Sequence, residues 1–197
     1  GYFNLINLLM AAETLNALRF DRADIARGLR QVQPVRGRME PVSIARSDVC
    51  VLVDYAHKPA ALSEALKAAR SITAGSVWVV FGAGGDRDQK KRSMMGEIAA
   101  GLADEVIVTS DNPRSEDPAD IANQIIVGTQ RGRARSQIVL DRADAIHLAI
   151  GEAVAGDLIL VAGKGHETHQ TIGEERRPFD DVAVCEQALA TRLEGRG

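Results

Sequence analysis

Apolar runs of strand length alternate with segments of helical spacing from Val49 onward. Nearly continuous apolar runs predict strands within residues 49–55, 76–85, 105–111, 136–141 and 157–165. Because these runs do not alternate with polar residues, we expect each strand to be buried on both faces, as in a mainly parallel sheet. The segment MEPVSI (39–44) is expected to add an antiparallel strand at the edge of the sheet.

Helical spacing fills the intervals between the expected strands. In PAALSEALKAARSI (59–72), Leu62, Ala65, Leu66 and Ala69 share one face, and Pro59 suits the first turn. Further helices are expected at 92–102, 119–130, 143–154 and 182–193. Strands that alternate with helices predict an α/β fold, with a Rossmann-like, mainly parallel sheet and helices on both of its faces.

The first 36 residues follow a different pattern. Residues 3–20 and 21–32 have the spacing of two helices, and Asp21 is a suitable N-cap for the second. Two short helices cannot build a core by themselves, so they should bury one face against something else. We therefore expect residues 1–36 to be the carboxyl-terminal helical end of another domain, and residues 37–197 to form a separate domain.

Composition narrows the class of protein. The 197 residues are 45% hydrophobic and 26% charged, with a formal net charge of -3, which favours a folded protein with small ligands over a nucleic-acid binder. No apolar run reaches the roughly 18 to 20 residues of a membrane helix, so we expect a cytoplasmic protein without a membrane partner. Cys50 and Cys185 are interpreted as two buried thiols, and no His/Cys/acid cluster indicates a metal site.

Four segments rich in glycine and charge follow the expected strands. They are DYAHKP (54–59), GAGGDRDQKKR (82–92), SDNPRSEDP (110–118) and GKGHE (163–167). The carboxyl ends of parallel strands share one edge of a sheet, which is where open α/β folds bind ligands. The sequence therefore predicts one cleft formed by all four segments.

The segment SDNPRSEDP has two interpretations. Asn-Pro starts turns, and Asp117 with Pro118 is a good beginning for a helix, so the segment could be a turn only. Alternatively, Arg114 could hold a carboxylate with two hydrogen bonds, Asn112 could add a neutral donor, and Asp111 could balance a cation. An amino acid carries both of these charges.

The other glycine-rich segments do not match nucleotide-binding motifs. Arg87 occupies the place of the third glycine of G-x-G-x-x-G, and no G-x-x-x-x-G-K-[ST] occurs, which makes Lys164 a poor phosphate-loop lysine. Arg87 could instead hold a second carboxylate, whereas residues 90–92 are more typical of a solvated helix face. The Gly163 carbonyl and the Glu167 carboxylate suit an ammonium group, and His166 is interpreted as structural.

Four further residues are candidates for ligand contacts. Asp54 at a strand end fits an acceptor for a ribose hydroxyl. His57 precedes a helix, where capping or packing is as consistent with the pattern as ligand contact. Asn4 and Asn7 are unusual on an otherwise apolar helix, and one of them could bond a base edge.

The motifs GYFNLINLLMAA, GRME, VDYAHKP, FGAGGDRDQKKR, SDNPRSEDP and GKGHE, in this order and spacing, resemble the Mur ligases over nearly the whole chain. DNPR followed by GKGHE is similar to the members that add meso-diaminopimelate, whereas lysine-adding relatives vary the arginine. AHKP departs slightly from the commoner AHTP. The resemblance implies contacts with the far end of diaminopimelate for Arg87, Asp111, Asn112, Pro113, Arg114, Gly163 and Glu167, and with the ATP base and ribose for Asn7, Arg38, Asp54 and His57.

The resemblance also implies a reaction in peptidoglycan precursor synthesis. ATP phosphorylates the D-glutamate side chain of UDP-MurNAc-L-Ala-D-Glu, and the diaminopimelate amine attacks the acyl phosphate. The family's phosphate loop, Mg²⁺ ligands and modified lysine belong to a central domain, so we expect this chain to bind but not to catalyse without its missing amino-terminal and central domains. A stand-alone amino-acid-binding module and an L-lysine-adding relative remain alternatives, and a dinucleotide oxidoreductase is disfavoured by the failed glycine pattern.

Overall fold

The computed structural model describes residues 2–32 and 35–195, with side chains from Ile6 onward. Contacts divide the chain into two compact units, residues 1–35 and 36–197. Within the described ranges, no helix combines the length and apolar character needed to cross a bilayer.

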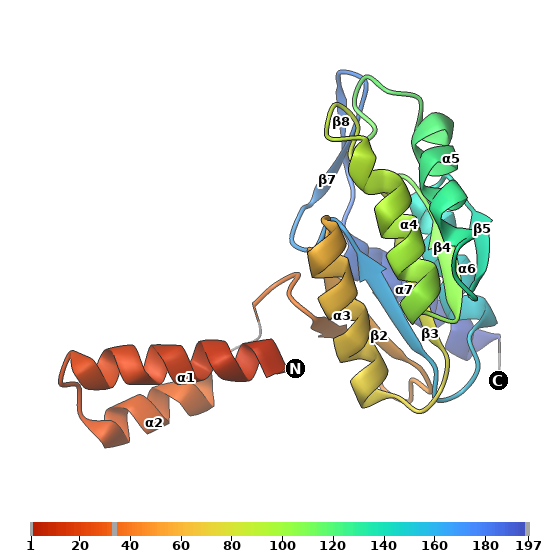
Figure 1. Ribbon diagram of the computed structural model, residues 1–197. Coiled ribbons are helices and arrows are strands. Elements are labelled where there is room, and N and C mark those ends of the chain that lie inside the picture. The colour runs from red at the N-terminus through yellow and green to blue at the C-terminus, as the bar shows by residue number, and fades with distance from the viewer. Residues whose placement is uncertain (1, 33–34, 196–197) are drawn as a thin grey trace. The chain divides into compact units, whose positions relative to one another are not determined.

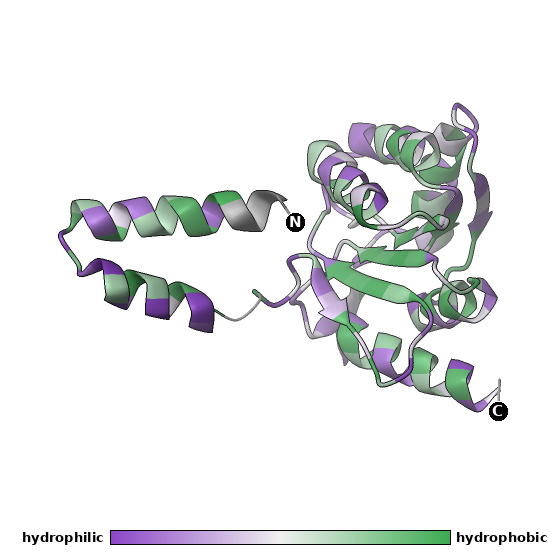
Figure 2. Cartoon of the chain, turned by 90° about the horizontal axis from the view of Figure 1, so that it is seen from below, coloured by the Kyte–Doolittle hydropathy of each residue, from purple (hydrophilic) through white to green (hydrophobic). Residues whose placement is uncertain are grey.

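The unit 1–35 contains two packed helices, α1 (Tyr2–Ala17) and α2 (Arg22–Gln31), so the expected helix pair is confirmed (Figure 1). Asp21 caps α2 by accepting a hydrogen bond from the Ala23 amide at 2.8 Å. Large apolar side chains of this unit remain exposed, among them Leu9 and Met10, and Figure 2 shows apolar residues along both helices. An apolar groove of about 730 Å³ lies between the helices.

The unit 36–197 is built on a six-stranded sheet with the order β1-β2-β6-β3-β4-β5. The strands are β1 (Glu40–Val42), β2 (Cys50–Asp54), β3 (Val77–Phe81), β4 (Glu105–Val108), β5 (Arg135–Ile138) and β6 (Leu158–Ala162). All neighbours are parallel except β1 and β2, which pair antiparallel at one edge. The predicted parallel sheet with an antiparallel edge strand is therefore confirmed.

Helices cover both faces of this sheet (Figure 1). One face packs against α3 (Pro59–Ile72), α4 (Lys90–Leu102) and α5 (Pro118–Thr129), and the other against α6 (Arg142–Glu152) and α7 (Asp181–Glu194). Each face of the sheet forms an apolar core with its helix layer, and the central strands contribute side chains to both cores. In β6, Leu158 and Leu160 face the first helix layer, while Ile159 and Val161 face the second. This explains why the central strands are continuously apolar, because neither face meets water.

Two expectations about burial are wrong. All four residues of β5 are exposed, because β5 is an edge strand and three of its residues are polar. Cys50 is exposed at the start of β2, and only Cys185 of the two thiols is buried.

The sequence pattern also missed a hairpin. Strands β7 (His169–Ile172) and β8 (Glu175–Pro178) pair antiparallel, and Gly173 makes the turn with φ 58°. Ile172 forms a parallel bridge with Arg114, which joins the hairpin to the loop after β4.

Candidate functional site

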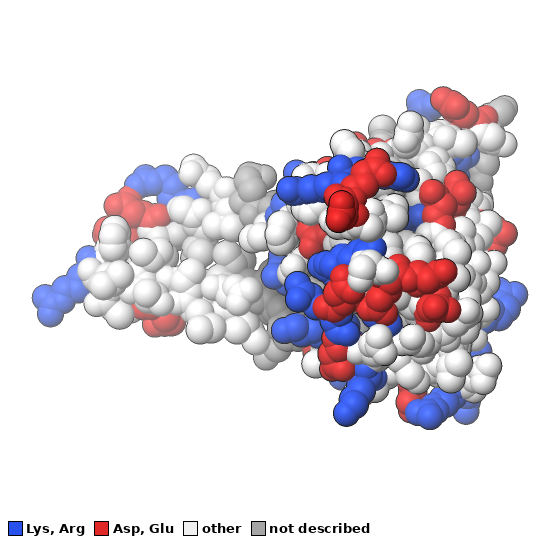
Figure 3. Space-filling model, turned by 90° about the horizontal axis from the view of Figure 1, so that it is seen from above, with Lys and Arg blue, Asp and Glu red and all other residues white. Residues whose placement is uncertain are grey.

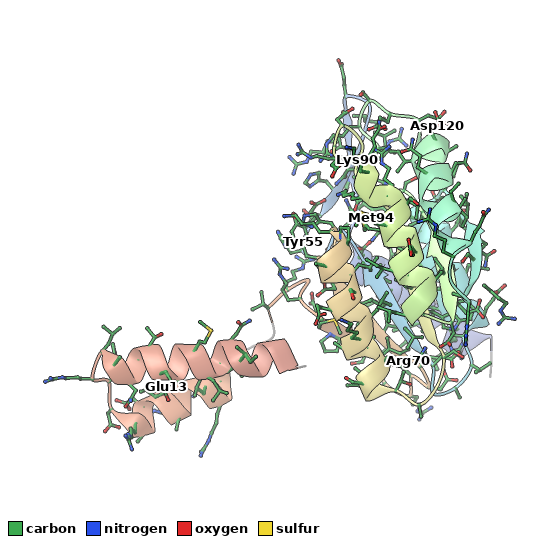
Figure 4. All side chains as sticks on the ribbon, viewed as in Figure 1. Glu13, Tyr55, Arg70, Lys90, Met94 and Asp120 are labelled. Atoms are coloured by element: carbon green, nitrogen blue, oxygen red, sulfur yellow. The ribbon has the colours of Figure 1, made fainter. Side chains whose placement is uncertain are left out.

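A cleft of about 600 Å³ lies at the carboxyl ends of the parallel strands. Its lining comes from the four charged and glycine-rich segments that follow β2, β3, β4 and β6, and from Met94 in α4. Figure 3 shows basic and acidic side chains next to one another on the face of this unit seen from above, and Figure 4 labels the lining residues Tyr55, Lys90 and Met94. The predicted residues that line this cleft are His57, Arg87, Asp111, Asn112, Arg114, Gly163 and Glu167.

Four predicted residues do not line the cleft. Pro113 is buried beside it, and its carbonyl accepts a hydrogen bond from the Glu116 amide. Arg38 is exposed and stacks over the ring of Tyr55, with 5.1 Å between the guanidinium carbon and the ring centroid. Asp54 is buried at the end of β2, and Asn7 belongs to the other unit, where it lines the groove between α1 and α2.

The backbone of Arg114 adopts the left-handed conformation, with φ 52°. Its amide donates to the Thr171 carbonyl at 3.1 Å, and its carbonyl accepts from the Gly173 amide at 2.6 Å, so the β7–β8 hairpin holds it. Its guanidinium donates to the Gly85 carbonyl at 2.7 Å. A Cβ on Gly84 would lie 2.9 Å from this guanidinium, so glycine at 84 allows the side chain to cross the loop after β3.

Glu167 also lines this cleft. Its Oε2 accepts from the Asn112 amide nitrogen at 2.9 Å and from the Lys164 ammonium at 3.1 Å. Burial raises the pKa of the Glu167 carboxyl, but these two hydrogen bonds and the Lys164 charge outweigh burial, so the pKa lies below its ordinary value. Glu167 is therefore a carboxylate at neutral pH.

The approach of Gly163 to Asp111 depends on the absence of a side chain at position 163. Gly163 has φ 118°, and a Cβ there would lie 2.7 Å from Asp111 Oδ2. Asp111 is 6% exposed, and its carbonyl accepts from the Gln170 side chain at 2.7 Å. The loops after β4 and β6 therefore meet at this point.

The expectation that residues 90–92 form a solvated helix face is wrong for two of the three. Both lysines line the cleft, but only Lys90 is exposed, whereas Lys91 is half-buried and donates to the His57 carbonyl at 3.0 Å. Burial lowers the pKa of Lys91, while the charge of Asp111 opposes this shift. Arg92 is fully buried against Glu116, and it shares the inner face of α4 with Met95 and Ala99.

An aromatic cluster borders the cleft after β2. The ring of Tyr55 lies 4.6 Å from the ring of His57 and 4.9 Å from the ring of His166, between centroids. His57 Nδ1 is 2.9 Å from the Tyr55 carbonyl. Burial raises the pKa of Asp54 and exceeds the lowering by the Met39 amide, which donates to Asp54 Oδ2 at 2.8 Å.

Among the described residues, no group of three His, Cys, Asp or Glu side chains could hold a metal ion.

The fold and the cleft define a Rossmann-like α/β domain with a cleft lined by charged residues at the carboxyl edge of its sheet. Residues 37–165 match the model of the Mur ligase family described as "Mur ligase, glutamate ligase domain". The chain belongs to the Mur ligase family.

Known proteins similar to this chain include two named UDP-N-acetylmuramoyl-L-alanyl-D-glutamate--2,6-diaminopimelate ligase. The protein of Prochlorococcus marinus (strain MIT 9313) is 48% identical over 99% of this chain, and that of Geobacillus thermodenitrificans (strain NG80-2) is 45% identical over 98%. A solved structure with the same name has a TM-score of 0.77 at 37% identity and covers 98% of this chain. The chain spans 39% of the length of each of these three proteins.

A more distant solved structure matches the fold alone. UDP-N-acetylmuramate-alanine ligase of Thermotoga maritima has a TM-score of 0.67 at 17% identity, and the match covers 100% of this chain and 39% of that one.

Proposed function

We propose that this chain is the amino-acid-binding part of an ATP-dependent ligase that adds meso-diaminopimelate to UDP-MurNAc-L-Ala-D-Glu. The observation that carries the proposal is that Arg114 and Glu167 line one cleft, so a cationic and an anionic side chain face the same ligand space. The names of the relatives that match 98–99% of the chain support the same substrate.

The cleft offers a complementary group for each charge at the far end of diaminopimelate. A guanidinium has five N–H groups, so Arg114 can hold a carboxylate while it keeps its bond to Gly85. Glu167 and the Gly163 carbonyl suit the ammonium, and Asp111 adds a second negative charge nearby. In this proposal Asn112 supports the carboxylate, Arg87 makes a further contact, and Pro113 completes the turn.

The proposed role of these side chains is binding rather than proton transfer. The resemblance to the family implies an acyl phosphate that the diaminopimelate amine attacks, and such chemistry depends on positioning and charge neutralisation. ATP and Mg²⁺ are assigned mainly to a central domain of the whole ligase. Arg38, Asp54 and His57 are proposed to face the ATP base and ribose, together with Asn7 from the 1–35 unit.

Asp54 fits a ribose hydroxyl under one condition. Its carboxylate already accepts from the amides of Met39 and Ala56, so a ribose hydroxyl would have to share it. A carboxylate has about four lone-pair positions, which leaves room for that third donor.

Selectivity between amino acids follows from Arg114. L-Lysine lacks the far carboxylate and would leave the guanidinium without its anionic partner in a partly desolvated cleft. Breaking one side of such a charge pair costs roughly 2 to 5 kcal/mol. This favours the diaminopimelate-adding function over the alternative, an L-lysine-adding relative.

The test compares Arg114→Ala with the parent in the whole ligase, using purified UDP-MurNAc-dipeptide and measuring product by mass spectrometry. We expect the KM for meso-diaminopimelate to rise at least about tenfold, with the KM for ATP within about twofold. Arg131→Ala, which removes an exposed arginine of the loop after α5, is the matched control. Equal losses for both substrates, or a parent enzyme that prefers L-lysine, would contradict the proposal.

A further inference from the structure

The Lys164 side chain is fully buried directly behind the cleft. Its ammonium lies 3.2 Å from Asn112 Oδ1 and 3.1 Å from Glu167 Oε2. An ammonium is almost never completely removed from water unless it is paired. Its two partners are the amide and the carboxylate that the proposed function assigns to the ligand, although Lys164 itself does not line the cleft.

Lys164 and the hairpin together fix the orientation of the Asn112 amide. The same amide atom receives the Lys164 ammonium and the Thr171 backbone N–H, the latter at 2.9 Å. Both of these groups are donors, so this atom must be the amide oxygen. The amide nitrogen is therefore turned toward Glu167, to which it donates at 2.9 Å. One N–H of that nitrogen holds Glu167, and the second can serve a ligand carboxylate.

We propose that Lys164 is a positioning residue, whose buried ammonium locks Asn112 and Glu167 into one unit oriented to receive the zwitterionic end of the amino acid. The proposal rests on the proposed function of the cleft. A site whose polar groups are held in place before the ligand arrives loses less free energy in ordering them on binding. Lys164 would thus act through its two partners, without touching the substrate.

Two consequences would follow from removing the ammonium. Glu167 would keep its burial but lose one of the two hydrogen bonds that favour its charged form. The Asn112 side-chain oxygen would lose one of the two hydrogen bonds that hold it in place. The amide could then rotate and turn that oxygen toward the ligand carboxylate. Both changes weaken the grip on the far end of the ligand and leave the reacting end untouched.

The experiment is Lys164→Met in the whole ligase, because methionine keeps an unbranched chain of similar length without the charge. Lys67→Met, at an exposed lysine on α3, is the matched control. We expect the KM for diaminopimelate to rise at least about tenfold while kcat stays within about threefold and the KM for ATP is unchanged, because binding remote from the reacting atoms is lost. A folded variant whose diaminopimelate KM stays within about twofold of the parent overturns the proposal.

A second comparison separates positioning from general packing and covers a poorly folding variant. Lys164→Met is combined with Asn112→Ala and Glu167→Gln, and this triple variant is compared with the double variant Asn112→Ala, Glu167→Gln. If Lys164 acts only through these two partners, its substitution should raise the KM by less than about threefold once both are replaced. An increase of tenfold or more in this background would mean an independent role and would overturn the proposal.

The role of Lys164 can be tested even if the diaminopimelate assignment is wrong. The far ammonium is present in both meso-diaminopimelate and L-lysine, so the Lys164→Met comparison is made with whichever amino acid the parent enzyme uses. A parent that uses L-lysine contradicts the diaminopimelate assignment. The KM ratio between variant and parent still decides whether Lys164 positions Glu167.

Discussion

The guanidinium of Arg92 is completely buried, and each of its two terminal nitrogens donates a hydrogen bond to one carboxylate oxygen of Glu116 at 2.8 Å. Glu116 also accepts from the backbone amide of Asp86 at 2.6 Å, and Ser115 donates to the Asp86 carboxylate at 2.6 Å. Glu116 belongs to the loop after β4 and Asp86 to the loop after β3. The Arg92–Glu116 pair therefore holds in place the two loops that carry Arg114 and Arg87.

Glu116→Gln should destabilise the protein, because it leaves the buried Arg92 charge without an anionic partner. Removing one partner of a fully buried pair costs about 3 to 5 kcal/mol, and Glu116 is partly exposed, so we expect roughly 2 to 3 kcal/mol. The measurement is urea unfolding at pH 7. Glu64→Gln, at an exposed glutamate of α3, is the control and should change stability by less than about 0.5 kcal/mol.

The same pair predicts a pH dependence of stability. The hydrogen bonds from Arg92 lower the pKa of Glu116 from 4.5 to about 2. A carboxyl whose folded pKa is depressed contributes stability that is complete above the unfolded pKa and disappears as the pH falls through the folded one. The stability difference between parent and Glu116→Gln should therefore be constant above about pH 5.5 and shrink between pH 4.5 and about 2. A difference that does not change over this interval would contradict the assignment.

A second buried pair lies behind the cleft, between the first turns of α6 and α7. Arg142 donates to both oxygens of Asp181 at 2.8 Å and to the Ala162 carbonyl at the end of β6 at 3.0 Å, and both side chains are fully buried. Asp181→Asn should cost about 3 to 5 kcal/mol, because the guanidinium loses its counter-charge in the core.

Asp120→Asn is the matched control for this substitution. Asp120 also occupies the first turn of a helix, α5, but it is exposed. Its loss removes only the favourable interaction with the helix dipole, about 0.3 to 1 kcal/mol. The double variant Arg142→Met with Asp181→Leu should recover most of the stability lost in Asp181→Asn, because replacing both charges leaves none buried alone. Thermal unfolding of the four proteins makes the comparison, and equal effects at 181 and 120 would contradict it.

Gly163→Ala should distort the cleft and destabilise the fold. Position 163 has φ 118°, and the new methyl group would lie 2.7 Å from Asp111 Oδ2. We expect a loss of about 2 kcal/mol or more, since backbone strain and the clash add. Gly101→Ala is the contrasting control: no atom would lie within 4 Å of the new methyl group, and helix propensity should raise stability by about 0.5 to 1 kcal/mol. Opposite signs in chemical unfolding are the expected outcome.

The fold and the position of the cleft could be predicted because their signals are local. Central strands such as β3 and β6 are apolar on both faces, and the carboxyl ends of parallel strands meet at one edge whatever their order. Strand order is a tertiary property, so the exposure of β5 at the edge could not be deduced from its own residues. The β7–β8 hairpin could not be predicted because the sequences of its strands, HQTI and ERRP, show no regular spacing of apolar residues.

The supporting charges of the site were harder to predict than its lining. The sequence pattern does contain a signal for the burial of Arg92: this residue lies three and seven residues before Met95 and Ala99, and therefore on the buried face of α4. No such signal exists for Lys164, because its burial depends on Asn112 and Glu167, which approach it only in the folded protein. The roles of the cleft residues toward a ligand, and of residues 1–36 within a larger protein, stay predictions.

The hairpin and the Asp111–Arg114 loop should open together. Gln170 donates to the Asp111 carbonyl at 2.7 Å, and the backbone bonds between Arg114 and both Thr171 and Gly173 continue the same connection. Gln170→Met removes the side-chain bond and leaves a buried carbonyl without that donor, a loss of about 1 to 3 kcal/mol. Amide hydrogen exchange of Arg114, Thr171 and Gly173 should accelerate together by about tenfold or more, because the free energy of local opening falls by the energy of the lost hydrogen bond.

Two controls test whether this opening is local. The amides of β2 and β6 should be unaffected, and Gln137→Met on the exposed strand β5 should change none of these rates. Faster exchange at Thr171 with an unchanged rate at Arg114 would contradict joint opening, because the Arg114 amide donates to the Thr171 carbonyl.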